Sequence, residues 1–463
     1  NAAGISVTNP LPASFTTAAN VTTTGASSDG MRLDNVPTAI INSNISASGT
    51  DSSGILYDGQ ETASLTTGGN ITAAYRGISA DASGDLVVNT AAGKTIASGG
   101  DGISVVKSQY GTSTTTLNNN STINSSGTHG IAVAAYYGGA ITINNTADVT
   151  ATGTSGLSSN ATCLNKGTAG ISAGSCNLGG EINIASSGKV TSSNGILAKV
   201  SGDFTPANSN NITINVSGDV IATDGVGISA KSDIGKIDIT TASSATIQAT
   251  GDAINVTSGG DIAVTNAATL ISLDGNGITT ESNPGSFIVN SGDITATTAG
   301  KFVIVGGEAV ETVTTTAGTL KGNIYLDAGN DSFTASGGAL VGNTLMGGGD
   351  DVATLTGTVD VTSAPQFDGD TDTDVLNVDG LTLRGFTAAS NDGTGNLTET
   401  NNSNLTGWET INVKNAGTLK LSNNLFTAAN VGTLNIDASS KLDLKGNSPG
   451  VFTIFGNVIN SGI

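Results

Sequence analysis

The sequence contains few of the residues that fill conventional protein cores or carry surface charge. Among 463 residues, 11% are charged and 4% are aromatic, with one Trp, two Met and seven Pro. Ordinary domains carry about 25% charged residues. The shortage of large side chains therefore argues against the three conventional domains that this length would suggest at about 150 residues each. Scarce proline excludes collagen, and a hydrophobic content of 37% with little charge argues against simple disorder.

Basic residues are also scarce, and this absence excludes several classes of partner. Lys and Arg number 16 against 37 acidic residues, which gives a formal net charge of −21. Binding to nucleic acids or to anionic membrane surfaces needs clustered positive charge, so neither is expected. The sequence has no apolar run of about 18 residues, and thus no predicted transmembrane helix. Because the pattern begins at the first residue, we expect any signal peptide to have been removed or left out of this sequence.

Only two cysteines are present, Cys163 and Cys176, and they flank a polar segment. A closely spaced pair in a chain otherwise free of cysteine predicts one local disulfide and an oxidising compartment. The alternatives are two unpaired thiols or half of a metal site. A zinc site would need two further ligands, and the sequence offers one histidine, His129. His129 precedes Gly130 at an expected corner and is predicted to be a solvated turn residue.

What the sequence has in abundance is glycine, at 65 residues, and much of it follows a repeat. A Gly-Ile or Gly-Met dipeptide recurs at steps of roughly 25 residues, with small polar residues after it. The dipeptide begins at Gly30, Gly54, Gly77, Gly102, Gly130, Gly170, Gly195, Gly227 and Gly277, and Ala253 replaces the glycine once.

Each repeat contains short runs in which polar and apolar residues alternate. After Gly227, for example, residues 236–240 and 245–250 are rich in Ile and Thr and are bounded by Gly, Ser or Asp. Such runs predict strands separated by turns. Three short strands cannot bury a face alone, but stacked on the next repeat they can. The sequence therefore predicts an all-β fold, a right-handed parallel β-helix with roughly 20–28 residues in each turn, here called a rung.

The pattern changes twice along the chain. We expect Gly-Ile rungs over residues 1–300, and acidic rungs with Gly-Asn and Asp-Asp motifs over 301–380. C-terminal rungs follow over 381–463. The acidic rungs resemble a calcium-binding nonapeptide, which makes Asp331, Asp351 and Asp372 candidate calcium ligands. The alternative is that these aspartates serve tight turns, for which their side chains are suited. No other cofactor is expected.

Together these features resemble the passenger domain of bacterial autotransporters, type V secreted proteins of the pertactin and AIDA-like adhesin type. The Gly-Ile rungs, the acidic rungs, residues 407–413 and the closing residues 455–463 carry the resemblance. It implies the surface of a Gram-negative bacterium or the extracellular space. It also implies that the chain meets a membrane only through a C-terminal outer-membrane β-barrel, which this sequence does not contain. In that family, adhesion, self-association and biofilm roles are the commonest.

Three functional hypotheses follow. The first is an adhesin or self-associating rod whose partner is a second copy or a host or surface ligand. The second is a passive structural filament or stalk. The third is a carbohydrate-active β-helix, but we predict no enzyme, because no carboxylate pair lies beside a basic residue in the sequence. Tyr136 and Tyr137 are candidate surface contacts, since adjacent residues of a strand point to opposite faces.

Overall fold

The described residues fold as a parallel β-solenoid, or β-helix, which confirms the predicted fold class, and the solenoid has about 16 turns. The computed structural model describes residues 3–8, 14–59, 62–107, 113–153, 163–164, 167–202, 210–361, 363–364, 366–385, 405–421, 425–426, 431–444 and 453–461. These residues contain no helix, and so none that is long and apolar enough to cross a membrane. The chain divides into two compact units, Asn1–Gly260 (unit 1) and Asp261–Ile463 (unit 2).

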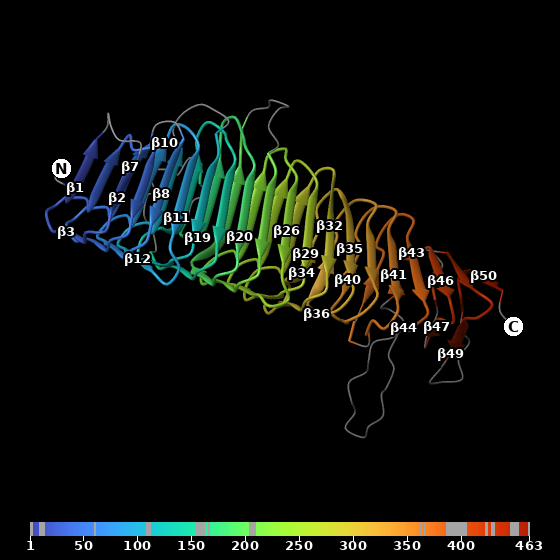
Figure 1. Cartoon of the computed structure of the whole chain (residues 1–463). Coiled ribbons are helices and arrows are strands. Elements are labelled where there is room, and N and C mark those ends of the chain that lie inside the picture. The colour runs from blue at the N-terminus through green and yellow to red at the C-terminus, as the bar shows by residue number, and fades with distance from the viewer. Residues whose placement is uncertain are drawn as a thin grey trace, which may run out of the picture. The chain divides into compact units, whose positions relative to one another are not determined.

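Unit 1 contains three parallel sheets, and each rung contributes one strand to each sheet (Figure 1). The first sheet consists of β1 (Ile5–Thr8), β4 (Met31–Asp34), β7 (Ile55–Gly59), β10 (Ile78–Ala82), β13 (Ile103–Lys107), β16 (His129–Ala135), β19 (Ala169–Ser175), β22 (Asn194–Val200), β25 (Ile228–Ser232) and β28 (Ile254–Ser258). The second sheet consists of β2 (Phe15–Thr17), β5 (Thr38–Ile41), β8 (Ala63–Thr67), β11 (Leu86–Thr90), β14 (Thr115–Asn119), β17 (Ile141–Asn145), β20 (Ile182–Ser186), β23 (Ile212–Val216) and β26 (Ile237–Thr241). The third sheet consists of β3 (Val21–Thr23), β6 (Ile45–Ala47), β9 (Ile71–Ala73), β12 (Thr95–Ser98), β15 (Thr122–Ser125), β18 (Val149–Ala151), β21 (Val190–Ser192), β24 (Val220–Ala222) and β27 (Thr246–Ala249).

Unit 2 repeats this arrangement, with shorter strands in its first sheet. Its first sheet consists of β31 (Ile278–Ser282), β34 (Phe302–Val305), β37 (Asn323–Tyr325), β40 (Thr344–Leu345), β42 (Phe367–Asp368) and β45 (Leu405–Thr406). Its second sheet consists of β29 (Ile262–Asn266), β32 (Gly285–Asn290), β35 (Val310–Thr315), β38 (Ser332–Ala335), β41 (Val352–Thr356), β43 (Val375–Asp379), β46 (Thr410–Lys414), β48 (Gly432–Ile436) and β50 (Gly456–Asn460). Its third sheet consists of β30 (Thr269–Ser272), β33 (Ile294–Ala296), β36 (Thr319–Lys321) and β39 (Ala339–Val341), and a small sheet of β44 (Thr382–Gly385), β47 (Thr418–Leu421) and β49 (Lys441–Leu444) follows.

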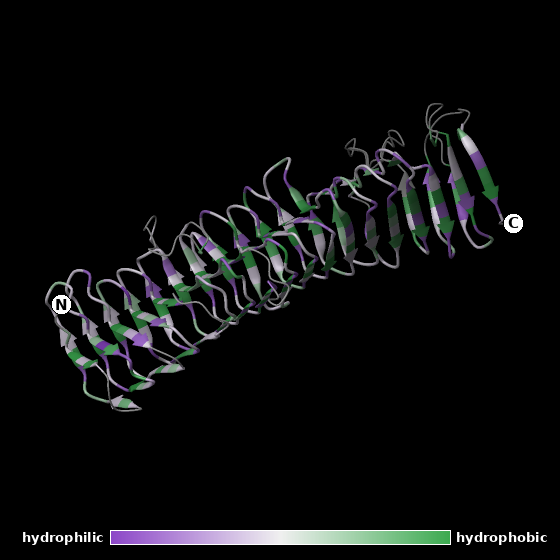
Figure 2. Ribbon diagram, turned by 90° about the horizontal axis from the view of Figure 1, so that it is seen from above, coloured by the Kyte–Doolittle hydropathy of each residue, from purple (hydrophilic) through white to green (hydrophobic). Residues whose placement is uncertain are grey.

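Alternation along each strand determines which side chains form the core. In β26, Ile237 and Ile239 are fully buried, whereas Asp238 and Thr240 point outward. The same two-residue period is visible in the alternating colours of most strands in Figure 2. Because the parallel strands pair in register, inward side chains lie beside inward side chains and outward beside outward. Ile212 thus lies beside Ile237, and Thr213 beside Asp238. Each rung thus adds a layer of Ile, Val, Leu and Ala to a narrow core, which explains the scarcity of aromatic residues.

The glycine of the Gly-Ile motif is required by close packing against the third sheet. A Cβ atom at Gly102 would lie 2.3 Å from Cγ2 of Ile123 and 2.5 Å from the carbonyl oxygen of Gly130. Gly77 has the same surroundings, provided by Ile96 and by Gly102. The repeat seen in the sequence therefore marks the corner where the first strand of each rung passes over a β-branched side chain of the third strand.

The length of a rung varies more than the predicted range of 20–28 residues. Ile131 pairs with Ile171, 40 positions later, and Val375 pairs with Thr410, 35 positions later. The additional positions fall between the described strands, and the strand register on either side is kept. Insertions of this kind cost little because the entropy of closing a loop rises slowly with its length.

Candidate functional site

A ladder of acidic residues lies at one corner of unit 2. It consists of Glu311, Asp331, Asp351, Asp374 and Glu409, one from each successive rung, and is called the acidic ladder below. The backbone N–H of each of the first four donates a hydrogen bond to the carboxylate of the next, at 2.7, 2.7, 2.8 and 2.8 Å. The first four side chains are at most 2% exposed. Carboxylates therefore accept the N–H groups that would otherwise lack a partner at this corner.

Turn geometry before each strand places these carboxylates. Gly329 and Gly349 have φ values of 138° and 131°, which favour glycine, and each stands two residues before its ladder aspartate. In the next rung Asp372 occupies the equivalent position with φ of 87°. The side chain of Asp372 is exposed at this turn, and Asp374 takes the place in the ladder.

Burial makes the ionised form of these groups costly. It raises the pKa of Glu311 to about 8, with a smaller contribution from the charge of Asp331. Burial likewise raises the pKa of Asp331 and of Asp374 to about 7 each, and that of Asp351 to about 6. The hydrogen bonds from backbone N–H groups lower these three values only in part. The acidic ladder therefore binds protons within the physiological pH range.

The arrangement differs from the calcium site predicted from the sequence. Asp331 and Asp351 lie on one column, as expected, but Asp372 does not join them. The second oxygens of Asp331, Asp351 and Asp374 are buried without a hydrogen-bond partner. In the part of the chain that the structure describes, no group of three or more acidic, His or Cys side chains is placed to hold a metal ion. Protons can pair with these oxygens, because burial raises the pKa values of the three carboxyls to about 6 to 7. Calcium binding at Asp331, Asp351 and Asp372 stays a prediction.

A second feature is the disulfide between Cys163 and Cys176, which confirms the predicted pairing. Their Cα atoms are 5.5 Å apart, within the usual range for a disulfide. Cys163 and the neighbouring Leu164 cover Ala132 and Ala134 of β16, two small residues that would otherwise face solvent. The disulfide thus fastens part of a long rung over the outer face of the first sheet.

Tyr136 packs against this disulfide cluster and is half-buried. Both Tyr136 and Tyr137 lie in the turn that follows β16, not on a strand. Tyr137 is also half-buried. The structure therefore gives Tyr136 a packing role, and the predicted alternation of a strand does not apply to the pair.

Replacing both cysteines with serine is expected to destabilise this region. Loop entropy gives about 3 kcal/mol for a disulfide that closes a loop of this size. We expect faster amide hydrogen exchange in β16 and in β19, where Ala132 lies beside Ser172. Treating the wild-type protein with a reductant should reproduce the effect. Unchanged exchange in β16 in both experiments would contradict the covering role.

The outer face of the second sheet in unit 1 is uncharged over many rungs. Each second-sheet strand from β8 to β23 directs two side chains outward, and none of these side chains carries a charge. They are Ser64, Thr66, Val87, Asn89, Thr116, Asn118, Thr142, Asn144, Asn183, Ala185, Thr213 and Asn215. The outer face of the first sheet differs, since Asp58 and Lys231 point outward there. We call these outward side chains of β8, β11, β14, β17, β20 and β23 the neutral face.

Unit 2 has a neutral face of its own on its second sheet. From β29 to β43 two aligned columns of outward residues contain Thr, Val, Ser, Ala, Asn and Phe. Phe287 and Val289 are 55% and 43% exposed, which is unusual for large apolar side chains. In a chain with a net charge of −21, an uncharged and partly apolar face on both units is a marked segregation of charge.

His129 has a different environment from the one predicted. It lies in β16 and is 1% exposed, so the expectation of a solvated turn residue was wrong. Its Nδ1 is 3.3 Å from Asp101, whose other oxygen is 3.7 Å from Nε of Arg76. His129 is buried because it begins β16, which lies between β13 and β19 in the first sheet.

Comparison of the chain with models of protein families, with curated proteins and with solved structures finds no match.

Proposed function

We propose that this protein is a surface-exposed β-solenoid that self-associates or adheres through the neutral face of its second sheet. The observation that carries the proposal is the absence of charge from the outward side chains of β8 to β23 in unit 1. Two copies that each carry a large negative charge repel one another at most surfaces. A face without charge is where close approach costs least.

The chemistry of the neutral face suits contact with a second copy. Its threonine and asparagine side chains recur at the spacing of the rungs, about 4.8 Å. In a second copy aligned with the first, the same groups recur at the same spacing, so one favourable contact is repeated along the face. Many weak contacts then act together, because each one formed raises the effective concentration for the next. Affinity would come from length, without any deep pocket.

The cellular setting follows from the same features and remains part of the proposal. The protein would be the passenger of a bacterial autotransporter, exposed at the cell surface or released from it. The solenoid fold and the disulfide support this reading, since structural disulfides persist in oxidising compartments. Adhesion to a surface ligand would use the same face that serves self-association.

Lysines introduced into the neutral face are expected to abolish self-association. Thr116 and Thr142 are outward neighbours on β14 and β17, and a Thr116→Lys, Thr142→Lys variant would bury two unpaired charges in any contact. We expect sedimentation velocity to show concentration-dependent association of the wild-type chain, and association at least 10-fold weaker in the variant.

The matched control is a Ser79→Lys, Ser229→Lys variant, which places two lysines on the outer face of the first sheet. It should associate as the wild type does. Both variants reduce the net negative charge equally, so general repulsion cannot explain a difference between them. A wild-type chain that stays monomeric at all concentrations would overturn the proposal, as would equal association of the two variants.

A further inference from the structure

A directional chain of side-chain amides runs along the neutral face of unit 1. Nδ2 of Asn118 donates to Oδ1 of Asn89, and Nδ2 of Asn144 donates to Oδ1 of Asn118, each at 2.8 Å. The next position in register is Ala185, and the one after it is Asn215. Ala185 therefore interrupts the chain of amides by one rung.

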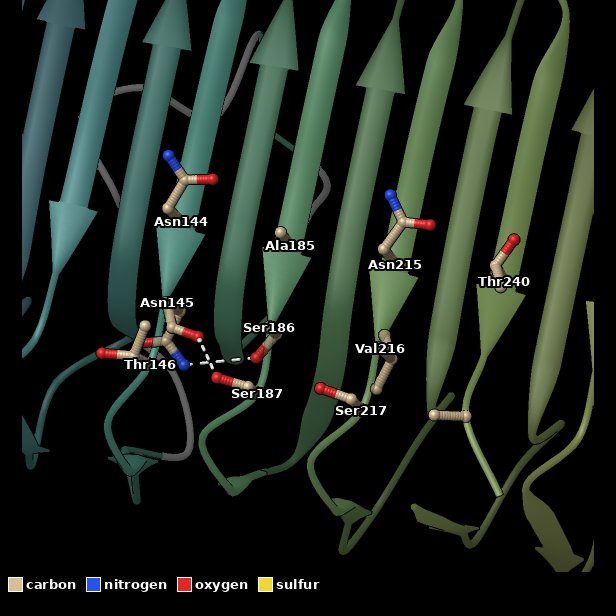
Figure 3. Close-up of a pocket in the computed structure, with 11 residues that line it drawn as sticks. Asn144, Asn145, Thr146, Ala185, Ser186, Ser187, Asn215, Val216, Ser217 and Thr240 are labelled. Atoms are coloured by element: carbon tan, nitrogen blue, oxygen red, sulfur yellow. Dashed lines mark hydrogen bonds between the residues drawn. The ribbon is translucent and has the colours of Figure 1, made fainter. Parts of the chain in front are cut away.

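The interruption leaves one acceptor and one donor unpaired on either side of Ala185. Within the described residues, Oδ1 of Asn144 and the amide of Asn215 have no hydrogen-bond partner, and Ala185 is exposed. Figure 3 shows the amide oxygen of Asn144 on the side of the Ala185 strand, and the amide nitrogen of Asn215 on that side as well. The two groups face the same gap from opposite ends.

The gap is part of a hollow of about 340 Å³ in the outer surface, at the small end of ligand-binding pockets. No charged residue lines it among those described. The lining consists of Asn144, Asn145, Thr146, Ala185, Ser186, Ser187, Asn215, Val216, Ser217, Thr240 and Ala242. The hydroxyls of Thr146, Ser187, Ser217 and Thr240 lie at exposed positions around the gap. The exposed surface of the hollow is mostly apolar, with polar groups among it. An uncharged ligand that presents both apolar and hydrogen-bonding groups fits this lining.

The missing element has a definite chemistry. Asn144 and Asn215 are two rungs apart, or about 9.6 Å along the sheet, and one amide placed between them restores the chain. In a trans secondary amide the N–H and C=O groups point in opposite directions. Such a group donates to the oxygen of Asn144 and accepts from the nitrogen of Asn215 at the same time.

We propose that the hollow over Ala185 binds the acetamido group of an uncharged N-acetylated sugar residue. The N–H of the acetamido group donates to Oδ1 of Asn144, and its C=O accepts from Nδ2 of Asn215. The sugar hydroxyls meet the surrounding serine and threonine hydroxyls. This site goes beyond self-association, because it is complete within one copy of the chain.

The proposal is tested by filling the gap in the whole protein. Ala185→Asn supplies the missing amide from the protein itself. We expect N-acetylglucosamine to bind the wild type in an NMR titration, with saturation transfer strongest at its acetamido methyl group. We expect binding at least 10-fold weaker in Ala185→Asn, with an unchanged or higher unfolding temperature. Ala263→Asn makes the same change at an outward position of unit 2 and should bind as the wild type does.

Two comparisons identify the ligand class. Glucose lacks the acetamido group and should bind at least 10-fold more weakly than N-acetylglucosamine. Asn215→Asp keeps the size of the side chain but removes the donor, so it should also lose binding. No binding of N-acetylglucosamine to the wild type, or undiminished binding to Ala185→Asn, would overturn the site. Equal binding of glucose would overturn the acetamido assignment, and tighter binding of a glutamine-containing peptide would overturn the assignment to a sugar.

Discussion

Lowering the pH from 8 to 5 is expected to stabilise unit 2, raising its unfolding temperature by about 10 °C or more. The folded pKa values of Glu311, Asp331, Asp351 and Asp374, about 6 to 8, lie above those of the unfolded chain. The folded state therefore holds protons more tightly, and stability is greatest below about pH 4 and falls as the pH rises through 6 to 8. One carboxyl with a folded pKa of about 7 contributes roughly 3 kcal/mol over this interval, or several degrees in a unit of this size.

Trp408 provides the measurement, since it is the only tryptophan in the chain and lies beside Glu409 of the ladder. Its indole N–H donates to the carbonyl of Phe367 at 3.1 Å, so its fluorescence reports on the folding of this part of unit 2. Thermal unfolding of the whole chain followed by this signal at several pH values gives the dependence directly. An unfolding temperature that rises from pH 5 to pH 8 would contradict the account.

The Asp331→Asn, Asp351→Asn, Asp374→Asn variant is the control for this prediction. Each asparagine keeps an oxygen to accept the backbone N–H but does not titrate. We expect a much flatter pH dependence, with greater stability than the wild type at pH 8. If calcium were the natural partner of these carboxylates, a chelator would destabilise the wild type at pH 8 and leave the variant unchanged. We expect the chelator to leave the stability of both the wild type and the variant unchanged.

A larger residue at the corner glycine is expected to be the most damaging single change in unit 1. Gly102→Val would place its side chain against Ile123 and the Gly130 carbonyl, which a Cβ atom alone would approach within 2.5 Å. Overpacking of this kind costs about 1–3 kcal/mol even for added methylenes. Because the nearest atoms include backbone, we expect the upper end of that range or more. The expected result is a lower urea midpoint with loss of protection in β13 and β16.

Gly348→Ala is the contrasting change. A Cβ there would have Thr371 Oγ1 at 3.5 Å as its nearest neighbour, and Gly348 is not among the positive-φ glycines. Its effect should stay within about 1 kcal/mol of zero, since removing a glycine also reduces the entropy of the unfolded chain. Gly102→Ala should fall between the two, because Ala253 occupies the equivalent position in one natural rung. Equal urea midpoints for Gly102→Val and Gly348→Ala would refute the packing explanation of the repeat.

The fold was predictable because its determinants are local and repeated. A two-residue alternation fixes the inward side of each strand, and the step between Gly-Ile dipeptides fixes the stacking partner. The loops of the long rungs were not predictable in this way. Residues 141–145 and 149–151 carry the alternation of strands, whereas Cys163 and Leu164 stand in no repeated pattern. The covering of Ala132 by the disulfide could therefore not be foreseen.

The candidate sites were predictable only in part. Asp370, Asp372 and Asp374 share the same alternation, so the sequence could not decide which of them stacks on Asp351. The strand register decides it, because Val375 pairs with Val352 and the N–H of Asp351 donates to Asp374. Glu311 lies outside any acidic motif and was missed. A signal did exist, because it stands 20 positions before Asp331, the same step that separates Asp331 from Asp351.

The neutral face could in principle be read from the sequence, but only once the register was known. Thr116, Thr142 and Thr213 are ordinary polar residues of alternating strands when each is taken alone. The parallel pairings place them in one column, and only then does the absence of charge become a property of a surface.

Clumping of cells that display the whole chain tests whether the neutral face brings copies of this protein together. We expect cells displaying the wild type or the Ser79→Lys, Ser229→Lys variant to clump and settle. Cells displaying Thr116→Lys, Thr142→Lys at the same surface density should remain dispersed. Clumping by all three, or by none of them, would contradict the claim.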